Sequence, residues 1–139
     1  MRPLISLRRL CTAVFVCGVL ITSGCGGPKI YPVSGVATLD GKPLEGFLVT
    51  FNPDTSKGTD GRMDCAGRLG SGGNYSIRMD DGFKQYKGMP AGFYKVTISS
   101  PDDKPIPVNK KYTNIKTTDL NVEVVPNPES GRYDLKFTK

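Results

Sequence analysis

The chain has 139 residues, a formal net charge of +6 at pH 7, and neither histidine nor tryptophan. That length predicts one domain, and the lack of histidine excludes Ser–His and Cys–His catalysis and disfavours a zinc site. The charges are dispersed rather than gathered into a basic stripe with interleaved aromatic residues, so we expect no nucleic-acid partner.

The first 24 residues predict a signal peptide. Residues 1–9 carry arginines and no acidic residue, and residues 10–21 (LCTAVFVCGVLI) are mostly apolar. A charged segment followed by a short apolar run is typical of a secretory signal, and twelve residues cannot cross ~30 Å of hydrocarbon as a helix. The alternative is an uncleaved anchor over residues 10–28, which the Gly, Ser, Thr and Pro content of that stretch disfavours.

Residues 21–25 (ITSGC) resemble the lipobox of bacterial lipoproteins, in which Leu, a small residue, and Gly or Ala precede Cys. The last three positions match, whereas Thr22 stands where Leu is usual. The resemblance implies cleavage between Gly24 and Cys25 and a diacylglycerol on the Cys25 sulfur. Two or three acyl chains give stable membrane attachment. By analogy with the sorting rule of such lipoproteins, Gly26 in place of Asp favours the outer membrane.

Residues 25–29 are expected to form the lipidated cysteine and a short tether. At no more than ~3.6 Å per residue, this segment would hold the following domain within about 15–20 Å of the membrane surface.

From residue 30 to 139, apolar and polar residues alternate between turn sequences, which predicts strands and no helix. For residues 31–39 the pattern leaves open whether Val36 or the set with Val33 and Ala37 faces the core. For the later strands, the predicted inward-facing residues are Phe47, Val49, Phe51, Tyr75, Ile77, Met79, Tyr94, Val96, Ile98, Leu120, Val122, Val124, Tyr133, Leu135 and Phe137. About seven short antiparallel strands, each with one apolar face, predict an all-β fold, a β-sandwich over residues 30–139.

Turn sequences separate these strands. They are residues 40–43 (DGKP), 80–82 (DDG), 90–92 (PAG) and 126–128 (PNP). Asp-Gly in the first of them favours a tight hairpin because glycine tolerates positive φ.

Three segments resemble carboxypeptidase regulatory-like domains, which have a transthyretin-like (prealbumin-like) fold. They are residues 33–46 (VSGVATLDGKPLEG), 64–68 (DCAGR) and 88–96 (GMPAGFYKV). With the lipobox before them and residues 111–113 (KYT) after them, the chain is similar to small lipoproteins of planctomycete-type bacteria. The resemblance implies an accessory binding or structural role without catalysis. Residues 69–73 depart from the family pattern and leave the strand order between residues 53 and 74 open.

Asp54, Asp60 and Asp64 are the candidate metal ligands, because carboxylates suit Ca²⁺. Their spacing does not match a calcium loop, and Lys57 and Arg62 compete for the carboxylates. We therefore expect a solvated loop, with no metal and no cofactor. Cys65 is the one cysteine of the predicted domain, so it has no disulfide partner there. Its thiol could pair between molecules or be a reactive site, but we expect an unpaired loop or core residue.

These features predict an envelope lipoprotein without enzymatic activity, whose partner is the membrane and an unidentified envelope protein or polysaccharide. The alternative is a carbohydrate-binding module, although the lack of tryptophan weakens it. Its candidate stacking residues are Tyr31, Phe83, Tyr86, Phe93 and Tyr112.

Overall fold

The computed structural model describes residues 26–139, so the signal peptide, the cleavage position and Cys25 lie outside the described residues. Within this range the fold is all-β and sandwich-like, as the alternating pattern predicts. The strands are β1 (Ile30–Tyr31), β2 (Ser34–Leu39), β3 (Lys42–Pro43), β4 (Leu48–Pro53), β5 (Asp64–Arg68), β6 (Asn74–Ser76), β7 (Arg78–Asp80), β8 (Gln85–Lys87), β9 (Met89–Pro90), β10 (Gly92–Ser99), β11 (Asn121–Val124) and β12 (Leu135–Phe137).

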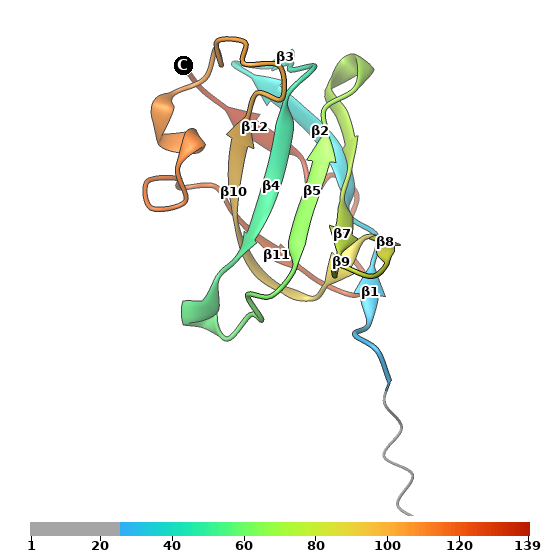
Figure 1. The fold of residues 1–139 in the computed structure, drawn as a ribbon. Helices are drawn as coiled ribbons and strands as arrows, with labels where there is room; N and C mark the ends of the chain where they lie inside the picture. Colours follow the sequence, from blue (N-terminus) through green and yellow to red (C-terminus); the bar gives the residue numbers. More distant parts are fainter. Residues whose placement is uncertain (1–25) are drawn as a thin grey trace, which may run out of the picture.

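The larger sheet has six antiparallel strands in the order β11-β10-β4-β5-β7-β8. The smaller sheet is built around β2, which pairs with β12, β3 and β6 (Figure 1). β1 and β9 form a short separate ribbon. One pair departs from the expected antiparallel pattern: β12 runs parallel to β2, because the long connection after β11 brings the chain back in the same direction.

Three 3-10 turns complete the described chain: η1 (Thr55–Lys57), η2 (Ser71–Gly73) and η3 (Lys110–Thr113). Residues 26–139 contain no helix long and apolar enough to cross a membrane.

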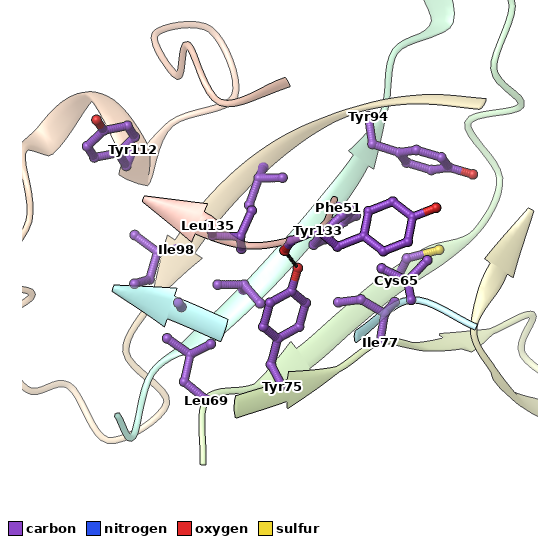
Figure 2. Packing of buried hydrophobic residues seen from close by; sticks show 14 of the residues in the cluster. Phe51, Cys65, Leu69, Tyr75, Ile77, Tyr94, Ile98, Tyr112, Tyr133 and Leu135 are labelled. Atoms are coloured by element: carbon purple, nitrogen blue, oxygen red, sulfur yellow. Dashed lines mark hydrogen bonds between the residues drawn. The ribbon is translucent and has the colours of Figure 1, made fainter. Parts of the chain in front are cut away.

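The core lies between the two sheets and contains most of the residues that the alternation predicts (Figure 2). It also contains buried residues that the alternation does not predict, namely Leu44, Cys65, Leu69, Met89, Val108 and Tyr112. Phe47, Leu120 and Val122 lie at its margin, partly buried. The ambiguity over residues 31–39 is resolved, since Val33 and Ala37 are buried and Val36 is only partly so.

The Asp40-Gly41 turn is also confirmed. Both residues have positive φ, of 49° and 81°, and Leu39 pairs with Lys42 across a two-residue loop. Positive φ at both central positions is the geometry that Asp-Gly favours in hairpins.

One continuous segment, residues 74–80, belongs to both sheets. Its first part, β6, pairs with β2 in the smaller sheet, and its second part, β7, pairs with β5 in the larger one. The change occurs at Ile77, whose N–H donates to the Val33 carbonyl (2.8 Å) and whose carbonyl accepts from the Gly88 N–H (2.9 Å). Both polar groups of the crossing residue are therefore satisfied, and its side chain is fully buried.

Two tyrosines join the smaller sheet to the C-terminal part of the chain. The buried Tyr75 hydroxyl donates to the Tyr133 carbonyl (Figure 2). The Tyr133 hydroxyl in turn accepts from the Val125 N–H at 3.1 Å. These bonds satisfy two hydroxyl groups that would otherwise be costly to bury.

We predict that Gly67→Ala destabilises the protein at this crossing. A Cβ at Gly67 would lie 2.7 Å from the Ser76 carbonyl oxygen and 3.1 Å from the Ile77 Cδ1 atom. Because backbone must move to relieve the overlap, we expect the free energy of unfolding, measured by urea denaturation, to fall by about 1–3 kcal/mol. Gly70→Ala is the matched control, since its Cβ would meet only the Asn74 oxygen, at 3.5 Å. Equal urea midpoints for the two variants would contradict the prediction.

Candidate functional site

Residues 26–29 lead away from one end of the sandwich, which we call the basal end (Figure 1). The loop 54–63, the turn 81–84 and the segment 90–92 lie at this end. A pocket of about 270 Å³ opens here. Most of its lining is apolar, and it includes Pro28, Pro53, Met63, Cys65, Pro90, Phe93 and Tyr94 together with the charged residues Lys57 and Asp60.

The loop that forms one wall of the pocket is bound to the start of β10. The Asp54 N–H donates to the Phe93 carbonyl (2.8 Å), and the Phe93 N–H donates to the Thr59 hydroxyl (2.9 Å). Gly92 has a φ of +152°, and a Cβ there would lie 2.9 Å from the Thr59 Cγ2 atom. The pocket wall therefore depends on a glycine at this position.

The acidic residues of this loop do not converge on one point, because each carboxylate binds a different partner. The Asp54 carboxylate accepts from the N–H and hydroxyl of Ser56 (3.2 and 2.5 Å), which holds the pKa of Asp54 below its usual value. Asp60 accepts two bonds of 3.1 Å from the Arg62 guanidinium, which lowers the pKa of Asp60. Asp64 lies apart on β5. Over residues 26–139 the His, Cys, Asp and Glu side chains form no group of three that could hold a metal ion.

Cys65 lies at the inner side of the pocket, in β5, with 1% of its surface exposed. Burial, with a smaller contribution from the Asp64 charge, raises the pKa of its thiol to about 11. Burial likewise raises the pKa of Tyr94, whose hydroxyl donates to the Pro90 carbonyl at 2.9 Å. Both groups are therefore protonated near neutral pH, and this lining suits the binding of an apolar group rather than nucleophilic or acid–base chemistry.

No family model, curated protein or solved structure matches this chain. The resemblance to carboxypeptidase regulatory-like domains thus stays a prediction, and the function has to be argued from the residues themselves.

A second hollow, of about 590 Å³, lies beside β5 and β7 of the larger sheet and β6 of the smaller one. Arg68, Arg78, Asn74 and Ser76 contribute its polar groups. Arg78 stands directly opposite Lys87 on β8, and in the described chain neither side chain has a carboxylate within 4.0 Å. Arg68 is 3.6 Å from Asp102. The alternating pattern marks these cations as outward-facing, but only the strand order makes them neighbours.

The candidate stacking residues do not form one platform. Tyr112 is buried edge-on against Phe137, with ring centroids 5.2 Å apart. Tyr31 and Tyr86 are half-buried. Phe83 is fully exposed and Phe93 is 37% exposed, but they belong to different elements. Gly24 and Cys25, the predicted cleavage and lipidation residues, lie outside the described range.

We predict that Cys65 is unreactive until the domain unfolds. At pH 8 a thiol with a pKa of about 11 is ~0.1% thiolate, against ~25% for an unperturbed cysteine. Alkylation by iodoacetamide should therefore be at least about 100-fold faster in unfolding urea than in buffer. Mass spectrometry of the tryptic peptide 63–68 resolves Cys65 from the other cysteines. Comparable rates in the two conditions would show that the thiol is accessible in the folded protein.

Proposed function

We propose that this chain is an exported bacterial envelope lipoprotein, held in the outer membrane by lipid on Cys25, with a non-catalytic β-sandwich. The observation that carries the proposal is the sequence ITSGC at residues 21–25, which follows a charged segment and an apolar run of signal-peptide length. Only Gly26 to Lys29 separate Cys25 from β1, so an anchor there would leave the basal end next to the membrane.

The role that fits this domain best is structural or protein-binding. Its core is apolar, and no buried side-chain polar atom of the described residues lacks a hydrogen-bond partner. The thiol and the tyrosine that line the basal pocket have pKa values raised by burial, the opposite of an activated nucleophile. The surfaces therefore offer contacts to a partner, and the chain has no histidine to support proton transfer near neutral pH.

One observation favours a second candidate, binding of an acidic envelope polysaccharide. Arg78 and Lys87 stand side by side on the outer sheet face, where like charges repel unless an anion lies between them. A guanidinium can bind a carboxylate through two parallel hydrogen bonds, and Asn74 and Ser76 could bind sugar hydroxyls.

For this second candidate, we expect Arg78→Ala to weaken retention on cross-linked polygalacturonate beads about tenfold, because a charged hydrogen bond is lost. Lys136→Ala is the control, since it removes an exposed cation from β12, in the other sheet. Equal retention of both variants, or no retention of the unmodified protein, would remove the polysaccharide candidate.

The lipoprotein proposal predicts that Cys25→Ala abolishes incorporation of radioactive palmitate and releases the chain from the membrane fraction. The reason is that the Cys25 sulfur would carry the acyl chains that hold the protein in the membrane. Cys17→Ala is the matched control, because Cys17 lies in the segment expected to be removed, so its label should equal that of the unmodified chain. Equal palmitate label in the Cys25→Ala variant would sink the proposal.

A further inference from the structure

Phe83 lies in the turn that joins β7 to β8, and its side chain is 100% exposed. A phenylalanine ring with no contact to the rest of the domain forgoes the free energy that an apolar side chain gains on burial. Scattered apolar residues are ordinary at surfaces, so exposure by itself assigns no role. Two further observations point to a role for this ring: the ordered backbone of its turn and the place of that turn in the molecule.

The backbone of this turn is held firmly. The Asp80 carboxylate accepts from the Gly82 N–H at 2.8 Å. The Asp81 carboxylate accepts from the N–H groups of Phe83 (2.9 Å) and Lys84 (2.7 Å). The two carboxylates therefore bind backbone of their own turn, and the ring projects from an ordered loop.

The turn lies at the basal end, beside β1 and residues 26–29 (Figure 1). At ~3.6 Å per residue, these four residues reach about 14 Å, so lipid on Cys25 would bring the basal end to the bilayer surface. Of the three exposed large apolar residues in the described chain, Phe83 and Phe93 both belong to segments at this end.

Lysines accompany the basal aromatic rings. The Lys84 ammonium lies 5.2 Å from the Tyr86 ring centroid, and the Lys57 ammonium lies 4.9 Å from that of Phe93. Such pairs suit a membrane interface, because the ring can enter the acyl boundary while the lysine extends to the headgroups. The segment 80–87 has equal numbers of acidic and basic residues, so the attraction would be apolar and not electrostatic.

We propose that the turn 81–84 inserts the Phe83 ring into the headgroup–acyl boundary of the membrane that carries the lipid anchor, so that the domain stands on its basal end. The occupant of this surface is the lipid bilayer itself. This inference rests on the proposed lipoprotein function, which supplies the proximity, and adds to it the orientation of the domain.

The chain contains no tryptophan, so Phe83→Trp introduces a single fluorophore. The full chain, expressed with its leader and purified in detergent, is reconstituted into phosphatidylcholine vesicles, with and without phosphatidylglycerol. We expect the indole at position 83 to emit at shorter wavelength than in detergent-free buffer and to be quenched by lipids brominated near the headgroup in both vesicle types.

Lys42→Trp is the matched control, because Lys42 is exposed on β3 at the opposite end of the sandwich (Figure 1). Quenching at position 83 should exceed that at position 42 by about twofold or more, since only an inserted ring meets the bromine atoms. Quenching confined to vesicles with anionic lipid would overturn apolar insertion.

Flotation of the same vesicles separates the two proposals. If both variants float and their indoles behave alike, the insertion of Phe83 is wrong while the lipid anchor stands. If neither variant floats, the lipoprotein proposal itself is wrong. A second readout without tryptophan uses trypsin. For the natural chain, cleavage after Lys84 should be slower in vesicles than in detergent. Phe83→Ser should restore the rate in vesicles to the rate in detergent. Equal protection of both chains would overturn the inference.

Discussion

The architecture depends on the crossing of one strand between two sheets at Ile77. A strand that changes sheets must leave one hydrogen-bonding partner before it reaches the next, which exposes backbone groups to an apolar core. Here the Val33 carbonyl and the Gly88 N–H bind the two polar groups of Ile77, so the crossing is made without unsatisfied atoms. Gly67 permits it sterically, because it has no side chain where the Ser76 carbonyl approaches.

This crossing also determines what lies at the basal end. Once the segment 74–80 has joined the larger sheet, the following turn has to emerge beside the first strand, since Gly88 and β9 return to pair with Ile77 and β1. The turn 81–84 and residues 26–29 therefore lie at the same end of the domain. Orientation on a membrane would thus follow from strand order and not from an added binding element.

The polar groups of the interior contribute to stability. Buried polar side chains such as Tyr75 and Thr118 bind backbone carbonyls, and the Cys65 thiol is kept protonated by its surroundings. These groups stabilise the sandwich and leave no poised acid, base or nucleophile among them. The proposed functions use the surface instead, namely the basal end and the cationic outer face of the larger sheet.

The sequence by itself determined the sandwich class and most of the inward-facing strand residues, because a period of two and Asp-Gly chemistry are local properties of the chain. It also supplied the lipobox resemblance, which no described residue tests. It left the face of residues 31–39 open and did not indicate that β12 runs parallel to β2, that Arg78 faces Lys87, or that the turn 81–84 lies at the same end as the tether. These depend on pairing between residues far apart in the chain, which only the packing of the two sheets around Ile77 decides.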